Sequence, residues 1–113
     1  MPEAIEIQLR KGVLELCVLA LLAEHDGYAY DIASRLAGAI GMGEGTIYPL
    51  MRRLQNEGLV ETYLVESPAG PSRKYYRLTA AGRRSFQSQK TAWSAFAGAV
   101  EDIVGLNKGG EAA

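Results

Sequence analysis

Residues 44–57 read Glu-Gly-Thr-Ile-Tyr-Pro-Leu-Met-Arg-Arg-Leu-Gln-Asn-Glu, and their apolar members recur at the spacing of one helix face. The predicted buried stripe of this helix consists of Ile47, Leu50, Met51 and Leu54. Pro49 presses on the carbonyl four residues earlier, but that residue is a glycine, so we expect the helix to continue with a slight bend. Gly58 is expected to end the helix.

Two further helices are predicted upstream of this stretch. Residues 28–40 repeat an apolar side chain every four positions, beginning at Tyr28, and a short glycine-containing turn joins them to the helix above. Residues 5–24 form the other helix, whose C-terminal half is apolar on nearly every side. In so small a domain, burial all round usually requires a partner chain. Gly27 is expected to close this helix in the left-handed conformation.

Downstream of the central helix, the pattern changes to that of strands. Residues 59–66 alternate between two faces, residues 67–72 have the composition of a turn, and residues 73–78 form a returning strand rich in tyrosine. Thr79 can cap a last helix over residues 80–106. The predicted order is therefore three helices, a β-hairpin and one long helix.

The last helix carries a heptad pattern of large apolar residues. The pattern consists of Phe86, Trp93 and Val100, spaced seven apart, and of Phe96 and Ile103, three after the last two. Gln89 interrupts it at one d position. A narrow apolar seam has little to bury within this chain, so it predicts a second subunit. With the first helix included, the predicted dimer contacts are Val13, Leu14, Cys17, Phe86, Trp93, Phe96, Val100 and Ile103.

Two helices joined by a short turn and followed by a hairpin make a winged helix-turn-helix. We therefore predict a mostly α fold with a small β-hairpin: a winged helix-turn-helix domain at residues 1–79, a dimerisation helix at 80–107 and a disordered tail at 108–113. In such folds the second helix of the pair enters the DNA major groove by its N-terminal end. The predicted DNA contacts are Gly45, Thr46, Tyr48, Arg52 and Arg53 on that helix, with Arg73 and Lys74 on the wing.

The charge distribution favours one positive face on an acidic body. The chain has 12 basic and 13 acidic residues, but residues 46–90 hold eight basic and three acidic ones, a net charge of +5 that leaves −6 for the rest. Chance clustering is the alternative explanation. Arg52 and Arg53 are also compatible with ordinary solvated helix positions, and Tyr48 with the core.

Several classes of protein are disfavoured. Cys17 and His25 each occur once, which leaves no disulfide and no metal-ligand cluster. No nucleophile lies beside a base and no glycine loop could hold phosphates, so we predict neither an enzyme nor a cofactor. The longest apolar run falls short of the ~20 residues that span a bilayer. These features predict a cytoplasmic protein without a membrane partner.

The chain resembles the PadR family of bacterial transcriptional regulators in three stretches, Tyr28-Ala-Tyr-Asp-Ile32, Gly45-Thr-Ile-Tyr-Pro-Leu-Met-Arg-Arg-Leu54 and Arg73-Lys-Tyr-Tyr-Arg-Leu-Thr79. The resemblance covers roughly residues 8–106, and the single C-terminal helix is similar to that of short family members. It implies a homodimer in which the last helix crosses the partner's first helix. It also implies, in most cases, repression through an inverted-repeat operator in double-stranded DNA.

The resemblance further implies a response to small molecules. In a multidrug-responsive branch of the family, a tryptophan on the last helix stacks on planar aromatic compounds, and Trp93 lies where that tryptophan falls. Trp93 and Phe96 of two chains could then form an aromatic cage whose occupation releases DNA. The alternative is that Trp93 is only a residue of the dimer seam. A rival from another class is a winged-helix protein-interaction module without DNA binding, which the net acidity permits.

Overall fold

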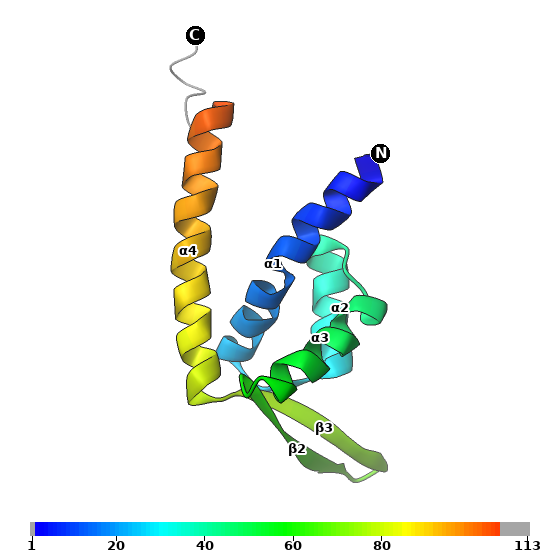
Figure 1. Ribbon diagram of the computed structural model, residues 1–113. Coiled ribbons are helices and arrows are strands. Elements are labelled where there is room, and N and C mark those ends of the chain that lie inside the picture. Colours follow the sequence, from blue (N-terminus) through cyan, green and yellow to red (C-terminus); the bar gives the residue numbers. More distant parts are fainter. Residues whose placement is uncertain (1, 107–113) are drawn as a thin grey trace.

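The computed structural model describes residues 2–106, apart from the side chains of residues 2–8, 10 and 11 (Figure 1). The predicted disordered tail at 108–113 lies outside the described residues, as does residue 107. The elements are α1 (Pro2–Glu24), β1 (Gly27–Tyr28), α2 (Ala29–Ile40), α3 (Glu44–Asn56), β2 (Val60–Ser67), β3 (Gly70–Leu78) and α4 (Ala80–Val104). The mostly α architecture with a long C-terminal helix is confirmed.

The sheet has three antiparallel strands in the order β1-β3-β2, rather than the predicted hairpin alone. The added strand, β1, places Gly27 opposite Tyr76 and Tyr28 opposite Tyr75. Two predictions are therefore wrong. Tyr28 is not part of the second helix, and Gly27 is not left-handed, because it is extended within a strand. Pairing with a strand distant in sequence overrides the local pattern at this position.

The hairpin is longer than predicted. The expected turn at residues 67–72 is reduced to two residues, 68 and 69, and β3 already begins at Gly70. The register is regular from Val60 opposite Leu78 to Val65 opposite Arg73, and shifts before the tip. Pro71 is tolerated within β3 because it lies beyond that regular register, where a missing N–H costs little.

One core joins α1, α2, α3 and the inner face of the sheet. The predicted stripe of α3 is confirmed, since Ile47, Met51 and Leu54 are inaccessible to solvent and Leu50 is buried. Burial of side chains of this size contributes about 1.5–3 kcal/mol each. The other buried apolar residues are Leu14, Val18, Leu19, Leu22, Ile32, Ala33, Leu36, Met42, Val60, Tyr76 and Leu78.

The start of α4 is fixed to the core by a cap and a close contact. Thr79 accepts a hydrogen bond from the Gly82 N–H at 3.0 Å, which confirms the predicted cap, and its hydroxyl donates to the Gly58 carbonyl at 2.7 Å. A Cβ on Gly82 would lie 2.0 Å from the Leu59 carbonyl oxygen. Only glycine therefore allows α4 to begin this close to the chain that leaves α3.

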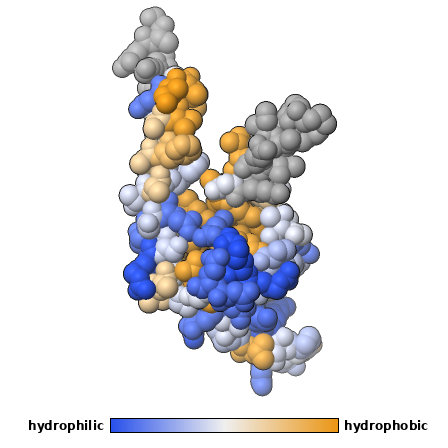
Figure 2. All heavy atoms as spheres, in the orientation of Figure 1, coloured by the Kyte–Doolittle hydropathy of each residue, from blue (hydrophilic) through white to orange (hydrophobic). Residues whose placement is uncertain are grey.

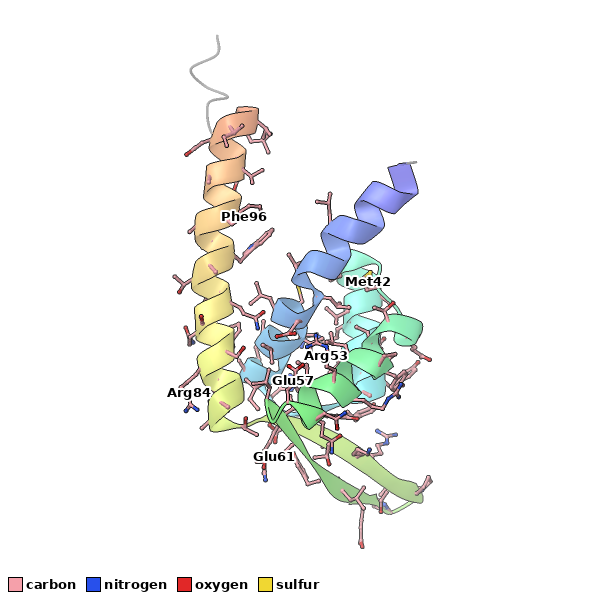
Figure 3. The ribbon with its side chains drawn as sticks, in the orientation of Figure 1. Met42, Arg53, Glu57, Glu61, Arg84 and Phe96 are labelled. Carbon is pink, nitrogen blue, oxygen red and sulfur yellow. The ribbon has the colours of Figure 1, made fainter. Side chains whose placement is uncertain are left out.

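Beyond this point α1 and α4 diverge (Figure 1). On the face shown in Figure 2, the far half of α4 is largely apolar, and Phe96 projects on the side that faces α1 (Figure 3). The C-terminal half of α4 thus extends away from the core with large apolar side chains uncovered by its own chain, among them Phe96, Ile103 and Val104.

Candidate nucleic-acid interface

The α2–α3 pair is joined by a turn of three residues that leaves the start of α3 accessible. Gly41 adopts the left-handed conformation with φ 71°, and its N–H donates to the Ala37 carbonyl at 3.1 Å. Met42 anchors the turn in the core, whereas Glu44 and Gly45 are exposed. Because Gly45 has only open space around its Cβ position, a ligand can approach the backbone there.

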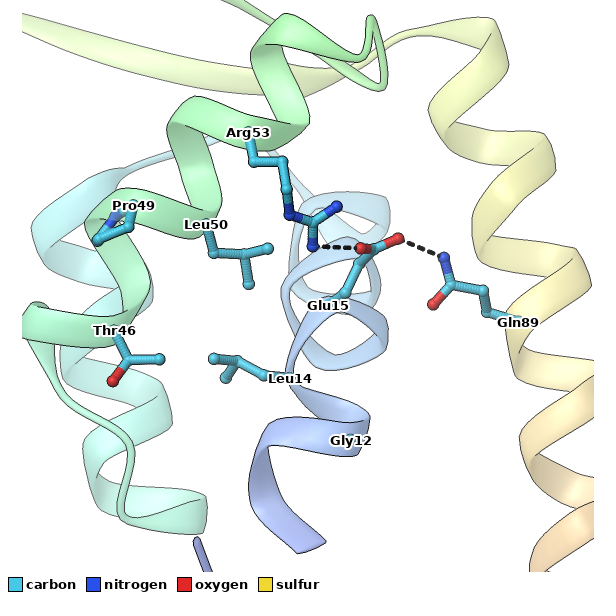
Figure 4. Close-up of a pocket in the computed structure, with 8 residues that line it drawn as sticks. All are labelled: Gly12, Leu14, Glu15, Thr46, Pro49, Leu50, Arg53 and Gln89. Carbon is cyan, nitrogen blue, oxygen red and sulfur yellow. Dashed lines mark hydrogen bonds and ion pairs between the residues drawn. The ribbon is translucent and has the colours of Figure 1, made fainter. Parts of the chain in front are cut away.

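The predicted contact residues of α3 fall on two different sides of the helix. Gly45 and Arg52 are exposed, and Tyr48 is half-buried beside them. Burial raises the pKa of the Tyr76 hydroxyl on β3, and the nearby positive charge of Arg52 partly offsets this rise. Thr46 is half-buried on the side of α3 that faces α1, where it lines a pocket (Figure 4).

Arg53 points toward Glu15 of α1 (Figure 4). Its guanidinium forms an ion pair with Glu15 of α1 at 2.7 Å and another with Glu57 of α3 at 2.9 Å. The hydrogen bonds to these two carboxylates, the one to Glu15 first, raise the pKa of Arg53. The sequence grouped Arg53 with Arg52 as a DNA contact, but neighbouring helix positions differ by about 100° in direction.

A row of three tyrosine rings crosses the outer face of the sheet. Tyr75 lies between Tyr28 and Tyr63, with ring centroids 5.5 Å and 5.8 Å away. The Arg73 guanidinium lies 4.8 Å from the Tyr28 ring and that of Arg77 lies 5.0 Å from the Tyr63 ring. Such cation–π contacts restrict the arginine side chains to defined positions above the sheet.

The two arginines of this row differ in their electrostatic surroundings. Arg77 forms an ion pair with Glu61 at 2.9 Å, which raises the pKa of Arg77 and balances its charge locally. The nearby Tyr63 hydroxyl donates to Asp26 at 2.6 Å, and this bond raises the pKa of Tyr63. Arg73 instead lies nearer the tip, next to the exposed Lys74. The positive charge of the wing is therefore concentrated at Arg73 and Lys74.

Two exposed residues near the start of α2 were not predicted as candidates. Tyr30 is 59% exposed, and with Ser34 it lines a small pocket of about 220 Å³ beside the start of α3. The first helix of a helix-turn-helix crosses the DNA backbone, so the Tyr30 hydroxyl is a candidate for a phosphate contact. The sequence could have indicated an exposed position for Tyr30, because this residue lies outside the apolar repeat of the helix.

The groove between α1 and α4 brings the predicted ligand residues together. It has a volume of about 550 Å³ and is lined by Leu9, Val13, Trp93, Phe96, Val100 and Glu101, among others. Trp93 is 46% exposed and Phe96 is 63% exposed. Of the other predicted dimer contacts, Leu14 is buried in the core of its own chain, and Cys17 and Phe86 pack against that core. Its own chain therefore covers Leu14, whereas Trp93, Phe96, Val100 and Ile103 stay exposed.

Other kinds of site find little support in the described part of the chain. Among the side chains that the structure describes, no group of three histidine, cysteine or acidic residues is arranged to hold a metal ion. Burial raises the pKa of the Cys17 thiol, which lowers its reactivity at neutral pH. No helix among the described residues is both long enough and apolar enough to cross a bilayer.

The helix pair, its turn and the adjoining hairpin define a winged helix-turn-helix protein with an appended C-terminal helix, the architecture of many transcriptional regulators. The chain belongs to the PadR-like family of transcriptional regulators, whose family model matches residues 18–88. This finding confirms the resemblance seen in the sequence.

Solved structures agree with this assignment. A PadR-like transcriptional regulator from Bacillus cereus is 36% identical, with a TM-score of 0.78, and the match covers 86% of this chain and 96% of that one. A PadR-like transcription factor from Bacteroides fragilis is 40% identical over 88% of this chain and 98% of its own, with a TM-score of 0.71. Bacillus subtilis PadR in complex with operator DNA is 26% identical over 68% of this chain and 45% of its own, with a TM-score of 0.61.

Proposed function

We propose that this PadR-like regulator binds an inverted-repeat operator as a homodimer and represses transcription. The observation that carries the proposal is the exposed surface formed by the start of α3 and the positive end of the wing, Arg73 and Lys74. Both parts are attached to one core, the wing through Val60, Tyr76 and Leu78, so they can meet DNA in a defined relative position. The complex of Bacillus subtilis PadR with operator DNA supports this use of the fold.

Each exposed residue has a role that fits its chemistry. Gly45 allows the backbone to approach the groove, Tyr48 offers a ring and a hydroxyl, and Arg52 can contact a guanine edge or a phosphate. Arg73, held over a tyrosine ring, and Lys74 are suited to the flanking backbone. Thr46 is a weaker candidate because its side chain lies in the pocket beneath α3.

The homodimer would be formed by covering the groove between α1 and α4. A second copy placed there would bury the apolar side of α4, including Phe96 and Ile103, which their own chain leaves in water. In such a dimer the two α3 helices would lie about 34 Å apart, one turn of DNA, as the half-sites of an inverted repeat require.

The same groove is the proposed site for a planar aromatic ligand that releases DNA. Trp93 and Phe96 supply aromatic faces, and Glu101 places a carboxylate among the lining residues. This combination favours planar compounds with a positive charge, since stacking and charge neutralisation would act together. A ligand that separates the helices around the groove would alter the distance between the two DNA-binding surfaces.

DNA binding is tested by fluorescence anisotropy with a duplex from upstream of the protein's own gene and a scrambled duplex of equal length. We expect tighter binding to the native duplex. Arg73→Ala should weaken binding to both duplexes and reduce the slope of log affinity against log salt by about the amount that one phosphate contact contributes. An unchanged salt dependence would rule out the wing contact. Equal affinity for both duplexes would rule out sequence-specific recognition, and binding to neither would favour the protein-interaction alternative.

Ligand binding is tested through the intrinsic fluorescence of Trp93, the single tryptophan of the chain. Titration with planar cationic dyes should quench this fluorescence and weaken binding to the operator duplex in parallel. A phenolic compound provides a neutral comparison of similar shape. Absence of quenching across both kinds of compound would leave Trp93 as a residue of the dimer seam.

A further inference from the structure

A polar chain links three helices at the place where the heptad pattern of α4 is interrupted. Gln89 donates from Nε2 to Glu15 Oε2 at 2.7 Å, and the other oxygen of Glu15 accepts from Arg53 at 2.7 Å. Gln89 also donates to the Ser85 hydroxyl at 3.0 Å, which fixes its orientation on α4. One carboxylate on α1 thus connects the dimerisation helix α4 to helix α3 (Figure 4).

The chain of contacts lies where apolar packing is incomplete. A pocket of about 540 Å³ opens between α1 and α3, and it is lined by Thr46, Pro49, Arg53, Glu15 and Gln89. Leu14 and Leu50 pack beside the pocket, but across its open part no side chains of the described residues are in contact to fix the distance between the helices. The charge-assisted hydrogen bond from Arg53 to Glu15 is short and directional, so it can fix that distance instead.

We infer that Glu15 is a positioning residue for DNA binding, which sets the placement of α3 relative to α1 and α4 through Arg53 and Gln89. This inference rests on the proposed DNA-binding function and assigns Arg53 a role other than contact with DNA. The ion pairs are partly exposed, with 49% of the Arg53 side chain and 26% of the Glu15 side chain accessible. Pairs of this kind add little to global stability.

The decisive variant is Glu15→Gln, because the two roles for Arg53 predict effects of opposite sign. If Arg53 contacted phosphates, removal of a competing carboxylate would free its guanidinium and tighten DNA binding. If Glu15 positions α3, the same variant weakens operator binding by about fivefold, as expected for a residue coupled to its neighbours. Its salt dependence stays that of the wild type, since no phosphate contact is lost.

The matched control is Glu57→Gln, which removes the same charge from the same arginine. Glu57 lies on α3 itself, four residues after Arg53, so its loss leaves the link between helices intact. We expect operator affinity within about twofold of the wild type for this control. Equal weakening by both variants, or tighter binding by Glu15→Gln, would overturn the inference.

A second variant, Gln89→Leu, tests the link from the side of α4. It makes the heptad pattern continuous and removes the donor to Glu15, so the protein should remain folded and dimeric while operator affinity falls about threefold. Combined with Glu15→Gln, it should add no further loss, because both changes break one chain of contacts. Full additivity of the two losses would contradict a shared role.

These outcomes separate the inference from the function on which it rests. If the wild-type protein fails to prefer the operator duplex, the proposed function fails, and the positioning role of Glu15 fails with it. If the wild type binds the operator and Glu15→Gln binds it equally well, only the positioning role of Glu15 fails. Circular dichroism and thermal unfolding of each variant confirm that a loss of affinity is not a loss of fold.

Discussion

The two halves of α4 differ in how much of their apolar surface is covered by their own chain. The first half is closed, because Thr79 caps it, Gly82 is in tight contact with Leu59, and Phe86 packs against the core. The second half is open, and Ile103 there is 85% exposed. The first half thus belongs to the folding unit and the second half to the proposed dimer surface, so substitutions in the two halves should affect different equilibria.

The largest expected effect comes from Gly82→Ala in the closed half. The new Cβ would lie 2.0 Å from the Leu59 carbonyl oxygen, so the start of α4 must move. We expect a loss of about 3 kcal/mol in the free energy of unfolding, measured by urea denaturation at fixed protein concentration. Gly98→Ala in the open half is the matched control and should stabilise by roughly 0.5–1 kcal/mol, since nothing lies within 4 Å of its Cβ position. A loss of similar size in both would remove the distinction between the halves.

An intermediate effect is expected from truncating one phenylalanine in each half. Phe96→Ala should raise the dissociation constant of the dimer about 30-fold, or about 2 kcal/mol, since it removes a large side chain from the seam. Phe86→Ala should instead lower the free energy of unfolding by about 2 kcal/mol, because Phe86 packs against the core. Sedimentation equilibrium and urea denaturation distinguish the two. A Phe96→Ala protein that associates like the wild type would show that the open half has another use.

The smallest effect is expected from Thr79→Ala at the boundary between wing and α4. The variant loses the acceptor for the Gly82 N–H and the donor to the Gly58 carbonyl, which should cost about 1 kcal/mol of stability. Thr79→Ser keeps both hydrogen bonds and should restore most of the loss. Thermal unfolding measures the difference, and an equal loss in the serine variant would mean that the methyl group, not the cap, matters.

The sequence predicted those features that depend on local periodicity. The stripe from Ile47 to Leu54 defined α3, and the alternation after Gly58 defined the hairpin, because each pattern follows from one element alone. The two-residue strand β1 could not be predicted, since Gly27 and Tyr28 acquire their conformation only by pairing with β3. The same limit applies to long-range pairing in general.

The candidate site was predicted less completely, and for a related reason. The positions of Arg52 and Arg53 in a helix were predictable, but the carboxylate of Glu15, 38 residues away from Arg53, determines where Arg53 points. Leu14 was assigned to a dimer surface because α1 is apolar all round, although the fold decides which of its faces the chain itself covers. The sequence gives the type of each residue, whereas the fold determines which residues become its interaction partners.

The short strand β1 has a mechanical consequence. Because Gly27 and Tyr28 pair with β3 immediately before α2 begins, the wing and the first helix of the DNA-binding pair share one hydrogen-bonded ladder. The base of the hairpin, at Tyr75 and Tyr76, therefore cannot move relative to the start of α2 without breaking these pairings. In the proposed dimer, the base of the wing and the helix pair of one subunit should move together, and adjustment to operators of different length should come from the spacing of the two subunits.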